Sequence, residues 1–437
     1  MLSARVLRLL LRSDDFKPET ILCLTFTKAG ATEMAERINS RLARWVMAPS
    51  LDIANDLKSL GERFDPDMVK RARTLFARVL DARGGGLRIQ TIHSFCQSLL
   101  GSFPAEIGLP PGFTLIEPRE EAALPMRLLA EMAVAAEREG RLGFGDQLRA
   151  LGHRLDEDRI QKLLIRCAKV PDVMAALPGG DGLLPYIRRM LCGGIDDVTG
   201  WLAARVETLG FVSDELDQLI AYNASWGTKT GLDRNAVIAD WRKKSGDDRV
   251  AGLKTLQDAW ITKSGTLHKI VPKPVADHYT ALCETLHRWC GPLIEIQLRA
   301  QQAEDFALML GVGREFADYY VQAKRQRGLV DYDDLIRKTL ELLEMPGMGD
   351  WIRYKLDQAT DHILIDEAQD TNDRQWAIIK AIAGEFFAGS GARGTVHRTL
   401  FTVGDFKQAI FGFQGTDPRH FAAAQNYFTE AEEAVER

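Results

Sequence analysis

The stretch that decides the fold is HILIDEAQD, residues 362–370, in which a short apolar run leads directly into the adjacent acids Asp366 and Glu367. An apolar run of this length is typical of a buried strand in a parallel sheet. Nucleotide hydrolases place two carboxylates at the C-terminal edge of such a sheet, where the first can hold Mg²⁺ and the second can orient or deprotonate the attacking water. Mg²⁺ suits the position because it prefers oxygen ligands and needs few from the protein. The pattern alone also fits a strand followed by a solvated acidic turn.

A second strand end followed by a polar turn lies further along the chain, at VGDFKQAIFGFQG, residues 403–415. The side-chain amide of Gln408 in this turn can hydrogen-bond a γ-phosphate and sense its loss. Phe411 and Phe413 offer aromatic faces on which an unpaired base can stack, a contact worth about 1–3 kcal/mol per base. Both phenylalanines also fit positions in a hydrophobic core.

Strand and helix patterns alternate at the two ends of the chain, and the middle is helical. Strand-length apolar or alternating runs occur at four places, residues 21–24, 87–92, 363–365 and 399–403. From about 103 to 328 such runs vanish, and Ala, Leu, Glu and Arg recur at helical spacing. We therefore predict an α/β fold with a parallel sheet, in which a domain made of residues 1–102 and 329–437 is interrupted by a mostly helical insertion, residues 103–328.

Composition excludes several classes of protein. The 437 residues are 46% hydrophobic and 27% charged, ordinary values for a globular chain of two or three domains. No run approaches the roughly 18 apolar residues of a membrane span, so we expect no membrane association. The six cysteines are scattered without a C-x-x-C pair, which argues against a zinc ribbon or a disulfide framework and favours the reducing cytoplasm. Because the formal net charge is -5, any nucleic-acid contact must come from a local patch.

Five blocks of sequence resemble, in the right order, the motifs of UvrD-type superfamily 1 DNA helicases. They are residues 24–34 (motif Ia), 90–96 (motif Ib), 330–336 (the acidic segment before motif II), 366–370 (motif II) and 403–415 (motif III). The residue sequence at 91–96, together with the long helical insertion, is most similar to the AddA helicase–nuclease subunit of bacterial double-strand-break repair. The resemblance implies a RecA-like P-loop NTPase fold, ATP and Mg²⁺ as cofactors, and 3′-to-5′ movement along single-stranded DNA. It also implies an AddB-type partner subunit.

The resemblance further implies roles for individual residues. Asp366 would bind Mg²⁺, Glu367 would activate water, and Gln408 would couple the γ-phosphate to DNA. The residues that would line the track for single-stranded DNA are Thr25, Phe26, Thr27, His93 and Phe413. His93 taken alone is also typical of a packing histidine at a helix start. Gln414 departs from the arginine that many family members carry at its position.

Two charged segments have both a structural and a functional interpretation. Asp331, Asp333 and Asp334 resemble a metal cluster, but their alternation with apolar residues favours helix-start caps. Residues 229–273 contain ten Lys or Arg against five Asp, with two tryptophans among them. This stretch suits a grip on the phosphates of duplex DNA, with contacts from Arg242, Lys243 and Lys244, and it equally fits a solvated helical face with core tryptophans.

A phosphate-binding loop of the form G-x-x-x-x-G-K-[ST] does not occur in the 437 residues. We interpret residues 4–11 as the remainder of the helix that such a loop opens, and we expect the chain to be a fragment without its loop, second motor domain and nuclease domain. Such a chain should hydrolyse ATP negligibly on its own. Two alternatives stay open: a non-enzymatic DNA-binding remnant or scaffold, and a UvrD-like repair helicase without a nuclease.

Overall fold

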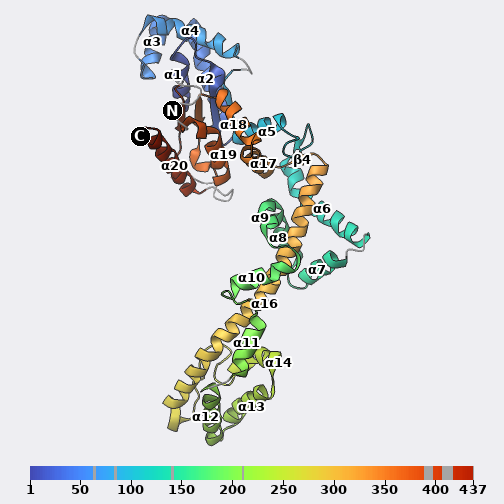
Figure 1. The fold of residues 1–437 in the computed structure, drawn as a ribbon. Coiled ribbons are helices and arrows are strands. Elements are labelled where there is room, and N and C mark those ends of the chain that lie inside the picture. Colours follow the sequence, from blue (N-terminus) through green and yellow to red (C-terminus); the bar gives the residue numbers. More distant parts are fainter. Residues whose placement is uncertain are drawn as a thin grey trace. The chain divides into compact units, whose positions relative to one another are not determined.

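The computed structural model describes residues 1–62, 65–82, 86–138, 142–208, 211–387, 397–405 and 417–436. The chain divides into two compact units, one formed by residues 1–121 and 324–437 and the other by residues 122–323 (Figure 1). The predicted boundaries fell at 102/103 and 328/329, so the first unit is larger than expected. The reason is a small parallel sheet in which β3 (Thr114–Leu115) pairs with β4 (Leu329–Val330) and keeps both segments in that unit.

A four-stranded parallel sheet organises the first unit. Its strands are β1 (Ile21–Thr25), β2 (Arg88–Thr91), β5 (His362–Ile365) and β6 (Thr399–Thr402), in the order β2-β1-β5-β6. Every neighbouring pair is parallel, so the carboxyl ends of all four strands share one edge. The predicted α/β fold with a parallel sheet and a helical insertion is confirmed.

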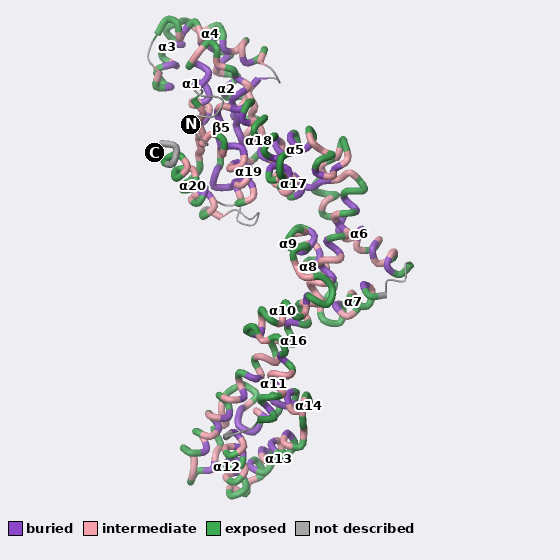
Figure 2. The backbone as a smooth tube through the Cα atoms, viewed as in Figure 1, coloured by how far each residue is buried: buried purple, intermediate pink, exposed green. Residues whose placement is uncertain are grey.

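Both faces of this sheet are covered by helices. Ile21, Cys23 and Leu364 belong to the hydrophobic cluster on one face, which includes helices α1 (Leu2–Leu11), α2 (Lys28–Met47), α3 (Ser50–Ser59) and α4 (Pro66–Leu80). Leu24 and Ile365 belong to the cluster on the other face, with α5 (Ile92–Ser102), α17 (Tyr332–Glu344), α18 (Met348–Gln358), α19 (Asp373–Ala383) and α20 (Pro418–Glu436). Because side chains alternate along a strand, burial on both faces requires the uninterrupted apolar runs seen in β1 and β5. Figure 2 shows the region around β5 as buried.

The second unit is helical. Its helices are α6 (Pro118–Arg138, which begins in the first unit), α7 (Leu142–Gly152), α8 (Glu157–Lys169), α9 (Pro171–Ala176), α10 (Leu183–Leu191), α11 (Val198–Glu207), α12 (Phe211–Trp226), α13 (Lys229–Lys243), α14 (Gly246–Ala251), α15 (Leu253–Gln257) and α16 (Ala276–Gln326, which ends in the first unit). Short 3-10 turns occur at Pro18–Thr20, Gly180–Gly182, Lys273–Val275, Ala368–Asp370 and Gly384–Phe387. Trp241 and Trp260 are buried in the core of this unit, as the structural interpretation of the basic stretch predicted.

Other expectations from composition can be compared with the structure. All six cysteines are buried and free. Burial raises the pKa of several of these thiols, for example Cys96 to about 12, so they remain protonated. Within the described ranges, no helix is both long and apolar enough to cross a membrane.

Candidate functional site

The adjacent acids lie at the carboxyl edge of the sheet, where the chain leaves β5. The backbone N–H of Asp366 donates to the carbonyl of Leu24 at 2.9 Å, so pairing with β1 continues to the first acid. At Glu367 the chain turns sharply, with φ 51° and ψ 44°, the left-handed region. Among the described residues it is the only one other than glycine with a positive φ. Such a backbone costs on the order of 1–3 kcal/mol and is retained mainly at functional sites.

The two carboxylates lie close enough for the charge of one to act on the other. Burial, and then the charge of Glu367, raises the pKa of Asp366 above its ordinary value, although the backbone N–H of Glu367, the chain's amino group and Arg37 act in the opposite direction. Neither acid forms an ion pair with any described residue. Two neighbouring carboxylates with no basic partner fit a divalent cation that prefers oxygen ligands, and this is the property expected of a Mg²⁺ site.

Gln369 fixes the geometry around Glu367. Its side chain is 1% exposed, and its Nε2 donates to Oε2 of Glu367 at 2.6 Å. Its Oε1 accepts from the backbone N–H of Asp405 at 3.0 Å. A Cβ atom at Gly404 would lie 2.7 Å from that Oε1, so the approach requires glycine. One amide therefore joins the turn after β5 to the segment after β6, a role that the sequence reasoning missed although Gln369 lies only two residues after Glu367.

A backbone hydrogen bond reinforces this connection. The N–H of Ala368 donates to the carbonyl of Val403 at 3.0 Å. The first residues of the predicted motif III, up to Asp405, thus lie beside motif II at the same sheet edge. Gln408 and Phe413 lie outside the described residues, so their positions near a γ-phosphate and a base stay predictions.

The three residues predicted to contact DNA after β1 lie at this edge as well. Thr25 is the last residue of β1 and is buried, with its hydroxyl donating to the carbonyl of Thr27 at 2.9 Å. Thr27 is exposed and caps α2, because its hydroxyl accepts from the N–H of Gly30 at 3.0 Å. Phe26 is half-buried between them. The threonine hydroxyls therefore already shape the turn, and the predicted contacts with DNA are not tested by this geometry.

His93 follows the end of β2, at the start of α5. The N-cap of that helix is Thr91, whose hydroxyl accepts from the N–H of Ser94 at 3.1 Å. The half-buried His93 ring packs edge-to-face against Tyr332 of α17, with ring centroids 5.0 Å apart. Burial lowers the pKa of His93, so the ring is neutral at physiological pH. The contact with Tyr332 supports the interpretation of His93 as a packing residue. A role of His93 in binding DNA stays a prediction.

The acidic segment before motif II is a helix cap. Asp331 and Asp334 form a reciprocal capping box at the start of α17, which confirms the predicted structural role. Nζ of Lys324, near the end of α16, lies 2.5 Å from a carboxylate oxygen of each. All three side chains are buried. In the part of the chain that the structure describes, no group of three or more His, Cys, Asp or Glu is arranged to hold a metal ion.

Two of the three cations predicted to contact duplex DNA are paired within their own unit. Nη1 of Arg242 lies 2.6 Å from Asp217, and Nζ of Lys244 lies 2.9 Å from Asp240. Lys243 is exposed. Two of these three positive charges are therefore balanced locally.

A parallel sheet with two adjacent acids at its carboxyl edge is the arrangement expected of a nucleotide-hydrolase domain, and comparison with known proteins identifies the family. Residues 1–429 match the UvrD/REP helicase N-terminal domain, and the chain belongs to this family. The resemblance drawn from the five motifs is confirmed.

Three relatives that match almost the whole of this chain are A subunits of ATP-dependent helicase/nucleases. The chain is 25% identical over 461 residues to the A subunit of the ATP-dependent helicase/nuclease of Syntrophomonas wolfei, covering 100% of this chain and 34% of the relative. It is 26% identical over 475 residues to the protein of that name from Pelotomaculum thermopropionicum, covering 96% of this chain and 33% of the relative. The corresponding protein of Pediococcus pentosaceus is 24% identical over 465 residues, with coverages of 100% and 35%. The chain thus spans about a third of the length of these curated relatives.

Proposed function

We propose that this chain forms part of an ATP-dependent DNA helicase of AddA type that acts in recombinational double-strand-break repair. The observation that carries the proposal is the pair Asp366 and Glu367 at the carboxyl edge of the parallel sheet, which forms no ion pair with any described residue and is joined through Gln369 to the segment after β6. The family and the names of the relatives support it. By the same similarity we propose 3′-to-5′ movement, a cytoplasmic location and an AddB-type partner subunit.

The acids would divide the work of nucleotide hydrolysis. Asp366 would hold Mg²⁺, which when bound would neutralise charge on the phosphates of ATP. Glu367, whose carboxylate is exposed and oriented by Gln369, would position the attacking water and accept its proton. Gln408 would couple the γ-phosphate to the DNA track.

The 437-residue polypeptide by itself should nevertheless hydrolyse ATP negligibly, because it contains no G-x-x-x-x-G-K-[ST] segment. The backbone amides and lysine of such a loop normally hold the β- and γ-phosphates. The check is a steady-state ATPase assay of the purified chain with and without single-stranded DNA. Robust DNA-stimulated turnover would refute this expectation.

Binding of single-stranded DNA does not require ATP hydrolysis and tests the proposal directly. Thr25, Phe26, Thr27, His93 and Phe413 would line the track. A fluorescent oligothymidylate should bind the chain, and Phe26→Ala should weaken binding about 5- to 100-fold, the loss of one stacked base. Tyr354→Ala is the matched control, because Tyr354 is an exposed aromatic on α18, which precedes β5. Absence of binding, or equal effects of the two substitutions, would remove the support for a DNA track.

We also propose that the basic stretch contributes to duplex binding through Lys243, with Arg242 and Lys244 contributing when they exchange their acidic partners for phosphates. Each phosphate neutralised adds about 0.9 to the slope of binding constant against salt on logarithmic scales. Reversing the charge of all three should therefore flatten that slope. An unchanged slope would refute this proposal. If, among the single charge reversals, only Lys243→Glu flattens the slope, the contact belongs to Lys243, the exposed member of the three.

A further inference from the structure

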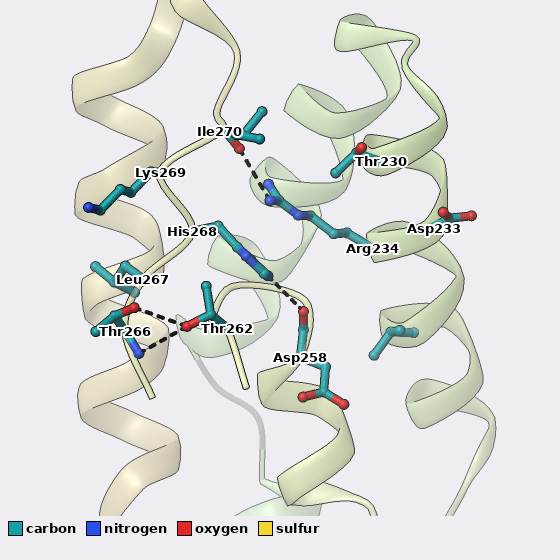
Figure 3. A pocket seen from close by; sticks show the side chains of 11 residues that line it. Thr230, Asp233, Arg234, Asp258, Thr262, Thr266, Leu267, His268, Lys269 and Ile270 are labelled. Carbon is teal, nitrogen blue, oxygen red and sulfur yellow. Dashed lines mark hydrogen bonds between the residues drawn. The ribbon is translucent and has the colours of Figure 1, made fainter. Parts of the chain in front are cut away.

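The helical unit contains a pocket of about 520 Å³ that none of the motifs accounts for. One wall is the first part of α13, and another is the segment after α15, where Ile261 pairs antiparallel with Leu267 (Figure 3). The pocket is lined by Thr230, Asp233, Arg234, Val237, Asp258, Thr262, Thr266, Leu267, His268, Lys269 and Ile270. All of these residues belong to the second unit, so the pocket lies within one compact body.

Arg234 is the unusual member of this lining. It is 5% exposed, yet it forms no ion pair with any described carboxylate. Its Nη1 donates to the hydroxyl of Tyr279 at 3.0 Å and its Nη2 to the carbonyl of Ile270 at 3.2 Å. The ring of Trp226 lies 5.7 Å from its guanidinium carbon. All of these partners are neutral, whereas a buried charge is normally paired with an opposite one.

A chain of hydrogen bonds through Tyr279 and two asparagines holds this arrangement in place. The Tyr279 hydroxyl donates to Oδ1 of Asn223 at 2.9 Å, and Nδ2 of Asn223 donates to Oδ1 of Asn235 at 3.0 Å. Asn223 and Tyr279 are fully buried. The network orients the guanidinium without neutralising it. A side chain fixed in this way has already lost the rotamer freedom that binding an anion would otherwise cost.

The rest of the pocket suits an anion. Thr230 contributes a hydroxyl group to the lining, as does Thr262, whose hydroxyl is also bonded to Thr266. The exposed Lys269 adds a second positive charge to the lining. The two acids of the lining, Asp233 and Asp258, are both exposed to solvent, which screens their charge. In Figure 3 the carboxylate of Asp258 points away from the guanidinium of Arg234.

We propose that this pocket binds a phosphate group, carried either by a DNA strand or by a small phosphate compound, with the guanidinium of Arg234 as its main recognition group. Hydrogen bonds between a guanidinium and phosphate oxygens are charge-assisted and directional. The pocket belongs to the second unit and the acids of the sheet edge to the first, so the proposed binding does not depend on ATP hydrolysis. It also differs from the contact proposed for Arg242, Lys243 and Lys244, because none of those residues lines the pocket.

The test is calorimetric titration of the 437-residue chain with inorganic phosphate at constant ionic strength, and separately with a short single-stranded oligonucleotide. Arg234→Gln should weaken binding about tenfold or more, since a hydrogen bond to a charged group is worth about 1.5–3 kcal/mol. Lys269→Glu should weaken it several-fold. Lys254→Glu is the charge-matched control, because Lys254 is exposed on α15 and does not line the pocket.

The outcomes separate the two sources of phosphate. If inorganic phosphate binds and Arg234→Gln weakens this binding, the pocket takes a small phosphate compound. If only the oligonucleotide binds in a way that depends on Arg234, the pocket takes a DNA strand. If circular dichroism shows that Arg234→Gln does not fold, the binding affinities of Lys269→Glu and Lys254→Glu are compared instead, since both substitutions replace exposed side chains. Failure of both titrants to bind, or affinities that Arg234→Gln and Lys269→Glu leave unchanged, would overturn the proposal.

Discussion

Two acidic segments of the same unit, Asp331 with Asp334 and Asp366 with Glu367, differ in how their charge is balanced. Each follows a strand, and in sequence each resembles a metal site. The first pair is buried and shares the ammonium group of Lys324, whose Nζ lies 2.5 Å from a carboxylate oxygen of each. The second pair has no ion-pair partner among the described residues. The number of acids therefore does not distinguish structure from function, whereas the presence of an internal cation does.

The pKa values of the two segments move in opposite directions. Burial alone would raise the pKa of Asp334, but the charge and hydrogen bond of Lys324, followed by Arg337, lower it below the ordinary 3.8. Burial and then the charge of Glu367 raise the pKa of Asp366 above that value. Asp334 thus adds stability above pH 3.8, which is lost as the pH falls through its lowered pKa. The contribution of Asp366 is fully present below pH 3.8 and is lost as the pH rises through its raised pKa.

The largest expected effect is at Lys324. Lys324→Met removes the cation and leaves two buried carboxylates without their ammonium partner, so the free energy of unfolding near pH 7 should fall by about 3–5 kcal/mol. Urea denaturation followed by circular dichroism measures the loss. The substitution should cost less at low pH, where the carboxylates become protonated.

Lys338→Met is the matched control for Lys324→Met. Lys338 lies on α17 and pairs with Glu341 at 2.7 Å, and the Glu341 side chain is 47% exposed. A pair of this kind is worth about 0–1 kcal/mol. Equal losses for the two lysines would contradict the conclusion that an internal cation makes the acidic segment before motif II structural.

An intermediate effect is expected at Gln369. Gln369→Ala removes the hydrogen-bond partner of the Asp405 N–H and of the Glu367 carboxylate, which should cost about 1–3 kcal/mol of unfolding free energy. Chemical denaturation measures this cost, with Gln358→Ala as control because Gln358 is exposed at the end of α18. If the two substitutions had the same small effect, the amide would not hold the two sheet-edge turns together.

The sequence predicted the features that depend on local pattern. The strands around 21–24 and 363–365 were predicted correctly because strands buried on both faces must be apolar throughout. The cap at Asp331 and Asp334 was predicted because a capping box is a contact over three residues. The family followed from five motifs in fixed order.

Contacts between distant residues were not predictable. The first unit extends to residue 121 because the two-residue strands β3 and β4 pair across the whole helical insertion. Lys324 reaches Asp331 only because α16 ends beside α17, and the partner of Arg242 lies on another helix, at Asp217. Such pairings depend on tertiary packing, and neither periodicity nor composition encodes them.

The smallest effect, and the sharpest test of the comparison, is expected at Asp366. Asp366→Asn removes one of two neighbouring negative charges, so the free energy of unfolding near pH 7 should rise, by on the order of 1 kcal/mol, the usual size of a single substitution. Because the pKa of Asp366 is raised, the gain should shrink as the pH falls and the wild-type carboxyl becomes protonated. Addition of Mg²⁺ should stabilise the wild type more than the variant, since only the wild type keeps both carboxylates for the ion. A loss of stability at pH 7 would mean that Asp366 has an internal partner after all, and the contrast with Asp334 would then disappear.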